Sequence, residues 1–287
     1  MRVTLTDSAD EFAAHAGALL AARIEHNVLA TVLASVRFRP SGTPMFSYIE
    51  DGAGVVVAAA LRTPPRRMLA STMNAVIAEA LMDAWLERDS EVPGVVGPFE
   101  VARSLARAWE QRTGGQSTLA MSEALHVLGE LRDPARPANG RLRVAGKEDR
   151  ELLVAWMRDF ELEAGLVDGD DREARVGRGI DRGLLHIWDD DGPVALVGRA
   201  PAVSGVVRIG PVYTPPALRA RGYASSAVAA LTRAMLDGDA RQCMLYTDLA
   251  NPTSNRIYAA LGFRRVADWE DLAFAPRMEE ASKSPPS

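Results

Sequence analysis

The chain has 287 residues, of which 47% are hydrophobic and 25% are charged, and its formal net charge at pH 7 is −5. This balance is typical of a protein that buries a full core, and the length allows one large domain or two of ordinary size. The negative charge and the lack of a Lys/Arg-rich run argue against a nucleic-acid partner.

The sequence shows neither a secretory signal pattern nor an apolar run of membrane-spanning length. We therefore expect a cytoplasmic protein with no membrane partner. The single cysteine, Cys243, has the apolar neighbours Met244 and Leu245, which favours a buried and unreactive thiol in a strand.

The first half alternates helical and strand patterns. Apolar residues at spacings of three to four predict an amphipathic helix over 10–35. Segments 45–49 and 54–61 flank the turn signal Glu50-Asp51-Gly52 and predict a hairpin that ends at Thr63-Pro64-Pro65. The next expected elements are helices at 71–85 and 99–111, a strand at 94–96 between them, and a candidate strand at 119–131.

A segment rich in Pro, Gly and polar residues, 132–140, predicts the domain boundary. The expected division is an N-terminal domain over 1–135, a second domain over 141–275 and a disordered tail over 276–287. In the second domain the expected order is strand 141–145, helix 147–163, a polar loop with Asp168, Asp170 and Asp171, a hairpin of strands 184–188 and 194–200, strand 205–214, helix 220–236, strand 242–247, a short helix ending before Gly262, and a last hairpin.

Residues 209–226 combine a strand, a loop and the start of a helix. The first N–H groups of a helix have no internal partner and its dipole is positive there, so this terminus can receive a pyrophosphate. Gly222 leaves room for phosphate oxygens to approach the backbone, and Ala224 keeps the next exposed position small. Arg219 and Arg221 add positive charge. The segment therefore predicts a phosphate-binding loop.

A second motif lies in 245–263. Asn251 is a good N-cap, Pro252 suits the first helical position and Gly262 fits just past the helix end. Asn255 and Tyr258 are three residues apart, so they share one face of this short helix and can approach one ligand.

The pattern Arg219-x-x-Gly222-x-Ala224 resembles the Q/R-x-x-G-x-G/A coenzyme A loop of the GNAT N-acetyltransferase superfamily. That family also has a strand ending in Val-Tyr-Thr before the loop and an Asn/Tyr-bearing helix after it, as here. The resemblance covers about residues 141–275. It implies the GNAT acyltransferase fold of the α/β (α+β) class, a mixed and mainly antiparallel sheet flanked by helices. The cofactor would lie between two strands that splay apart, here 205–214 and 242–247.

The resemblance further implies transfer of the acetyl group of acetyl-CoA to a primary amine by direct attack. It assigns cofactor binding to Val212, Tyr213, Thr214, Arg219, Ala220, Arg221, Gly222, Tyr223, Ala224, Ser225, Asn251 and Asn255. By family position, the Val212 N–H would stabilise the oxyanion and Tyr258 would be the acid that protonates the thiolate. The alternative reading makes Asn255 a solvated surface residue and Tyr258 a core aromatic.

The general base stays open. Glu161, Glu163 and Asp248 are the candidate carboxylates, with solvent or a purely structural role for each as the alternatives. The loop acids 168, 170 and 171 would either attract a cationic amine or only solvate the loop. Trp156 and Phe160 are expected in the core. The four histidines lack metal-ligand spacing, so we expect no metal.

The N-terminal half contains a segment similar to the strand before the coenzyme A loop. Segment 57–65 also ends in Thr-Pro-Pro, and a helix is expected after it. No glycine follows Pro65 in this stretch, so cofactor binding there is expected to be lost. This half is either a degenerate GNAT-like domain or an unrelated α/β cap that completes the acceptor pocket.

The acceptor class also stays open between a small-molecule amine and a peptide amine, and the chain would be a monomer or a homodimer. Two other functions are compatible with the sequence: a catalytically silent acetyl-CoA sensor or scaffold, and a generic α/β binding domain without cofactor.

Overall fold

The computed structural model describes residues 1–36, 43–165 and 171–275. The chain forms two compact units, one made of residues 1–123 with the described residues from 267 on, the other of residues 124–266. The predicted tail and the predicted loop acids Asp168 and Asp170 lie outside the described residues.

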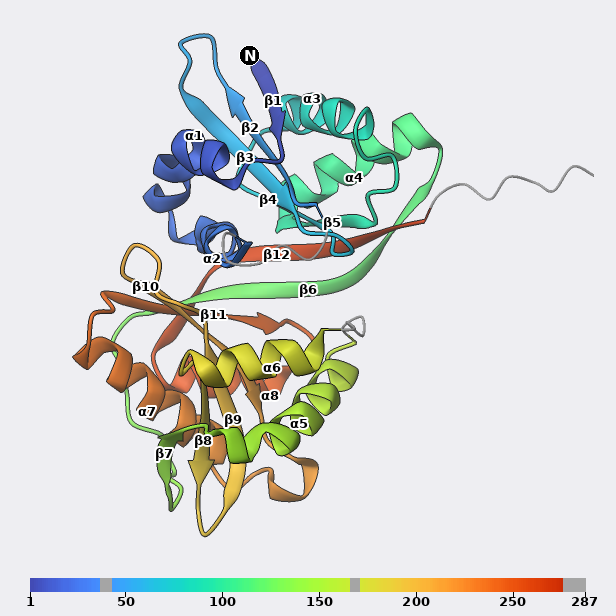
Figure 1. The fold of residues 1–287 in the computed structure, drawn as a ribbon. Coiled ribbons are helices and arrows are strands. Elements are labelled where there is room, and N and C mark those ends of the chain that lie inside the picture. Colours follow the sequence, from blue (N-terminus) through green and yellow to red (C-terminus); the bar gives the residue numbers. More distant parts are fainter. Residues whose placement is uncertain (37–42, 166–170, 276–287) are drawn as a thin grey trace, which may run out of the picture. The chain divides into compact units, whose positions relative to one another are not determined.

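The first unit begins with a strand and two helices and continues with alternating strands and helices (Figure 1). Its elements are β1 (Arg2–Thr6), α1 (Ala9–Ala22), α2 (Asn27–Val36), β2 (Met45–Glu50), β3 (Val56–Arg62), β4 (Met68–Ala70), α3 (Ala75–Leu86), β5 (Gly94–Pro98), α4 (Phe99–Thr113) and the first part of β6 (Gln116–Leu128). The strands lie in the order β1-β2-β3-β4-β5-β12. Trp85, Trp109, Leu81 and Leu105 lie in its core.

The second unit contains the rest of β6 and the start of β12 (Phe263–Ala275). Between them lie β7 (Arg141–Val144), α5 (Arg150–Glu163), α6 (Arg172–Asp181), β8 (Leu185–Asp189), β9 (Pro193–Arg199), β10 (Val206–Tyr213), α7 (Tyr223–Asp237), β11 (Gln242–Asp248) and α8 (Pro252–Ala260). Its strands lie in the order β6-β11-β10-β9-β8-β7.

The sheet of the second unit buries both faces. Neighbouring residues of β9 alternate between two clusters: Ala195 and Val197 pack with residues of α7, whereas Leu196 packs with residues of α5 and α6. This alternation follows from the two-residue period of a strand. Trp156 lies in the α5–α6 cluster, as expected, with its ring 6.3 Å from that of Tyr213.

The two units repeat one order of elements. The run of one strand, two helices, three strands, a helix, a strand, a helix and a strand occurs from β1 to β6 and again from β7 to β12. Strands β4 and β5 pair in parallel, as do β10 and β11. The pairs β1–β2, β2–β3, β3–β4, β5–β12, β7–β8, β8–β9 and β9–β10 are antiparallel. The expected mixed, mainly antiparallel sheet is confirmed. The repeat favours the GNAT-like reading of the N-terminal half over an unrelated cap.

Several expected elements differ in the structure. The helix expected over 10–35 is two helices, because Arg23 is extended and residues Ile24–His26 form a 3-10 turn. Helix α6 replaces part of the expected polar loop. Thr63-Pro64-Pro65 leads into strand β4 and not into a helix, so its match to Thr214-Pro215-Pro216 joins non-equivalent strands.

The end of the chain also differs from the expected hairpin. Residues Phe263–Ala275 form one strand, β12, whose residues Trp269 to Ala273 pair antiparallel with β5 of the first unit. The segment 132–140, the expected domain boundary, lies inside the second unit. The two compact units meet instead at residues 123–124 and 266–267, because strand β12, distant in sequence, completes the first sheet. Within the described residues no helix is both long and apolar enough to cross a membrane.

Candidate functional site

Strands β10 and β11 are paired over only three residue pairs. Their parallel register joins Val206 to Gln242, Val207 to Cys243 and Arg208 to Met244, and it ends there. On its other edge β10 stays paired with β9 up to Tyr213, with an irregularity between Ile209 and Val212. Pro211 lies in this irregular stretch and has no N–H for a ladder. The far half of β10 therefore faces β11 without pairing to it, as a splay requires.

The loop after β10 leads directly into an uncapped helix. Ala220 has a φ of 62° and Gly222 a φ of 85°, both in the left-handed region, and α7 begins at Tyr223. Its N-cap residue is Gly222, which has no side chain to accept from the first N–H groups of the helix. These groups could therefore bind an external acceptor, and a phosphate at this terminus stays a prediction of the loop motif.

Gly222 meets a second constraint besides its backbone angle. A Cβ at this position would lie 2.6 Å from the carbonyl oxygen of Arg136. The backbone N–H of Ala138 donates to Ser226 Oγ at 2.9 Å. Segment 132–140, which the sequence predicted as the domain boundary, thus packs on the first turn of α7.

The two loop arginines differ in their contacts. Arg219 donates to Glu163 at 2.6 Å and from Nε to the Thr214 carbonyl at 2.9 Å, so its charge is balanced by a carboxylate. Arg221 is exposed and donates to the Ala217 carbonyl over a long distance of 3.4 Å. Of the two, Arg221 is the guanidinium more available to an anion.

The first residues of α7 contribute mainly backbone to the loop surface. The Tyr223 ring is buried in the core, and its hydroxyl donates to Asp190 at 2.8 Å, which raises the pKa of the phenol. Ser225 Oγ donates to the Gly222 carbonyl at 2.8 Å. Ala224 is half-buried. A ligand at this terminus would therefore meet N–H groups and small side chains.

The polar residues of α8 are tied to their own chain. Asn251 caps the helix as expected, accepting from the Ser254 N–H at 3.1 Å. The Asn255 amide donates to the carbonyls of Asp248 at 3.0 Å and Asn251 at 2.9 Å. Asn255 is therefore neither a solvated surface residue nor a free amide. It stays a predicted cofactor contact, with one lone pair of its oxygen left for that purpose.

Tyr258 lies on the buried side of α8, with 9% of its surface exposed. Its ring packs edge-on against Phe263 with the centroids 6.3 Å apart, and burial raises the pKa of its hydroxyl to about 12. The side chain is therefore part of the core, and its phenol stays protonated over the physiological range. These properties suit a proton donor and do not by themselves assign one.

The three candidate bases are already engaged. Glu161 is buried and accepts from Arg172 at 2.7 Å and from Arg175. Glu163 pairs with Arg219, and Asp248 accepts from the Ala250 N–H at 2.7 Å. Their geometry explains each carboxylate structurally, so none of them stands out as a base.

In the first unit, side chains of the same unit accept from backbone N–H groups at and just before the N-terminus of α3. The N-terminus of α3 is capped by Asn74, whose side chain accepts from the Ile77 N–H at 3.0 Å. Ahead of it, the Thr72 N–H donates to His26 Nε2 at 3.2 Å. The loss of cofactor binding in this half stays a prediction.

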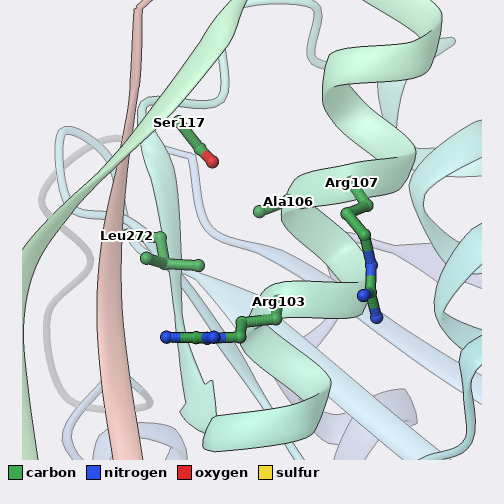
Figure 2. A pocket seen from close by; sticks show the side chains of 5 residues that line it. All are labelled: Arg103, Ala106, Arg107, Ser117 and Leu272. Atoms are coloured by element: carbon green, nitrogen blue, oxygen red, sulfur yellow. The ribbon is translucent and has the colours of Figure 1, made fainter.

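A cavity of about 310 Å³ in the first unit lies among α4, β6 and β12 (Figure 2). Its lining includes Arg103, whose guanidinium extends toward β12 and pairs with Glu270 through two bonds of 2.9 Å. Ser117, also in the lining, donates to Glu110 at 2.6 Å. These polar groups satisfy one another, so the cavity does not assemble a transfer site.

Other titratable side chains behave as buried structural groups. Cys243 is fully buried, as expected, and burial raises the pKa of its thiol to about 11. Among the residues that the structure describes, no three or more His, Cys, Asp or Glu side chains gather in a way that could hold a metal ion.

Residues 192–272, which include the loop and α8, match the family model described as FR47-like protein. An acetyltransferase of the GNAT family from Colwellia psychrerythraea superposes with a TM-score of 0.59 at 11% identity, over 96% of this chain and 100% of that chain. A GCN5-related N-acetyltransferase from Sphaerobacter thermophilus gives 0.61 at 13% identity, over 96% and 95%.

A tandem GNAT protein from the clavulanic acid biosynthesis pathway gives a TM-score of 0.57 at 15% identity, over 96% of this chain and 98% of that chain. No curated protein matches the sequence. At these sequence identities, the similarity to the solved structures shows the fold alone. The chain therefore has the GNAT fold over nearly its whole length, and its resemblance to the GNAT superfamily is confirmed.

Proposed function

We propose that this chain is an N-acetyltransferase that transfers the acetyl group of acetyl-CoA to a primary amine by direct attack. The observation that carries the proposal is the uncapped N-terminus of α7, reached through Gly222 from the strand whose pairing with β11 has ended. An anion at the helix terminus and an extended chain along an unpaired strand edge are what this geometry favours. Coenzyme A combines both features in one molecule.

The pyrophosphate would lie against the N–H groups at the start of α7, with Arg221 as the nearby cation. The pantetheine would follow the free edge of β10 from Tyr213 toward Val212. Gly222 fits this role because its φ of 85° turns the backbone without a side chain. Arg219 supports the loop through Glu163 and the Thr214 carbonyl and would act mainly on loop shape.

In the reaction, the amine nitrogen bonds to the thioester carbon, the carbon–sulfur bond breaks, and the thiolate takes up a proton. The Val212 N–H would stabilise the oxyanion that forms on the carbonyl oxygen. Tyr258 would donate its hydroxyl proton to the departing sulfur, since burial keeps the phenol protonated at every working pH, and a proton from solvent would then restore the phenol. The proton lost by the amine would pass to solvent, because the three candidate carboxylates are engaged elsewhere.

The same engaged carboxylates favour a second candidate, an acetyl-CoA-binding sensor or scaffold without turnover. Calorimetric titration with acetyl-CoA and release of free thiol over a panel of small-molecule and peptide amines separate the two. Saturable binding with thiol release supports the enzyme. Binding without release from any amine supports the sensor, and no binding contradicts both.

A further inference from the structure

A chain of three hydrogen-bonded side chains runs beneath α8. His126 of β6 contacts Thr247 of β11 at 3.1 Å between Nε2 and Oγ1, and Thr247 Oγ1 contacts Asn255 Oδ1 of α8 at 2.5 Å. His126 is 5% exposed and Thr247 is buried. The chain joins two strands to the short helix that carries Tyr258.

The direction of each bond follows from the Asn255 amide. Its nitrogen faces two carbonyl oxygens, so its oxygen must face Thr247 and accept a proton from that hydroxyl. A threonine hydroxyl that donates to Asn255 has only lone pairs to offer His126. His126 must therefore donate through Nε2–H, which fixes its tautomer.

The other ring nitrogen completes the assignment. His126 Nδ1 is fully buried and has no partner among the described residues. A proton there would be left without an acceptor, and burial together with the charge of Arg265 lowers the pKa of the ring. His126 is accordingly a neutral imidazole with one defined donor.

Helix α8 depends on this polar anchor more than a longer helix would. It has nine residues, and Tyr258 is its one buried residue. Apolar packing holds it near its C-terminal end, where Tyr258, the partly buried Ile257 and the C-cap Leu261 join the core cluster. The Asn255 side chain holds it one turn earlier, on the same face.

We propose that His126 is a positioning residue, which holds α8 on β11 through Thr247 and Asn255 and thereby fixes the place of the Tyr258 hydroxyl. The catalytic part of this proposal rests on the proposed function. The anchoring of α8 by His126 is independent of that function.

The test compares His126→Met, which removes the donor, with His126→Gln, whose amide nitrogen can replace Nε2–H. Amide hydrogen exchange in the full chain is followed in α8 and, as an internal reference, in α7. We expect faster exchange in α8 alone for His126→Met and wild-type exchange for His126→Gln. Unchanged α8 exchange in His126→Met would overturn the proposal. If that variant does not fold, Thr247→Val breaks the same chain with little change in shape.

Kinetics then separate anchoring from general damage. In the wild-type background, His126→Met should lower kcat about tenfold or more and leave the Kd for acetyl-CoA within about twofold. In a Tyr258→Phe background the same substitution should change kcat by less than about twofold, because the effects of coupled residues are not additive. An equal loss of kcat in both backgrounds overturns the link to Tyr258. If wild type releases no thiol, the proposed function fails, and hydrogen exchange alone decides whether His126 anchors α8.

Discussion

Position 222 requires a glycine for two reasons, its backbone angle and the lack of space for a Cβ. Its φ of 85° is costly for a residue with a Cβ, and the Arg136 carbonyl fills the space where a Cβ would lie. The glycine recognised in the sequence as a phosphate-approach position is thus also required by the packing of segment 132–140. Substituting it would disturb the loop and confound a binding experiment, so the cofactor site is better tested at its neighbour.

Ala224→Glu is that test. A carboxylate in the first turn of a helix is favourable for the helix and unfavourable for a bound pyrophosphate. We expect the fold and the melting temperature to be retained while the Kd for acetyl-CoA rises about tenfold or more relative to Ala224→Gln, the matched neutral variant. Calorimetry measures both constants, and equal affinities of the two variants would contradict a pyrophosphate at this terminus.

Tyr258→Phe separates chemistry from packing. The ring contact with Phe263 is kept, so the melting temperature and the acetyl-CoA Kd should hardly change. If the hydroxyl is the acid, kcat should fall about 100- to 10,000-fold with little change in the acceptor KM.

The pH profile adds an independent check. Because the pKa of the phenol is raised to about 12, its ionisation should produce no alkaline fall in kcat below about pH 10. A kcat within about twofold of wild type in Tyr258→Phe, with chemistry rate-limiting, would leave Tyr258 as a core aromatic and solvent as the proton source.

At the scale of elements, the sequence predicts best where one local pattern decides the outcome. The strand–loop–helix at 206–237 and the capped helix at 252–260 were predicted nearly to the residue, because glycine, proline and asparagine mark their ends. The divergence of β10 and β11 was predicted from the family resemblance and not from the residues themselves.

Elements decided by distant contacts were missed. Helix α6 carries five charged residues among ten, and its sequence resembles a loop until Val176 and Ile180 are seen to pack with residues of β8 and α5. Strand β12 looked like a hairpin because its pairing partner, β5, lies about 170 residues away. The hydrogen bond of His126 to Thr247 joins residues 121 positions apart, and no short-range pattern marks it.

The α5–α6 pair offers a prediction at this scale. Glu161 lies between Arg172 and Arg175, so Glu161→Gln removes a carboxylate charge that pairs with both guanidinium groups and leaves Arg175 with Asp171. Since both arginines keep some contact with water, we expect a loss of about 1 to 3 kcal/mol in the free energy of unfolding, below the range for fully buried pairs.

Activity distinguishes this structural role from the catalytic one. We expect kcat of Glu161→Gln to stay within about twofold of wild type at a temperature where it is folded. Chemical denaturation and thiol-release assays give the two numbers. A large fall in kcat without loss of stability would identify Glu161 as the base.

At the scale of the whole molecule, the two units share one order of elements and differ at the N-terminus of one helix. Both units place a parallel strand pair beside a helix N-terminus, but only in the second is that terminus free of a capping side chain. In the first, Asn74 accepts from the Ile77 N–H of the first turn, and His26 accepts from the Thr72 N–H just ahead of the helix. The repeat therefore predicts one cofactor site per chain rather than two.

The stoichiometry of acetyl-CoA binding to the full chain tests this account most directly. Isothermal titration should give one acetyl-CoA per chain, and Ala224→Glu should weaken that single binding event. The Asn74→Ala variant, which uncaps α3, serves as the control and should still bind one, because the stretch after Pro65 has no glycine that would let a pyrophosphate approach the backbone. Two acetyl-CoA molecules per wild-type chain, or no saturable binding, would contradict the assignment of the site to the β10–α7 loop.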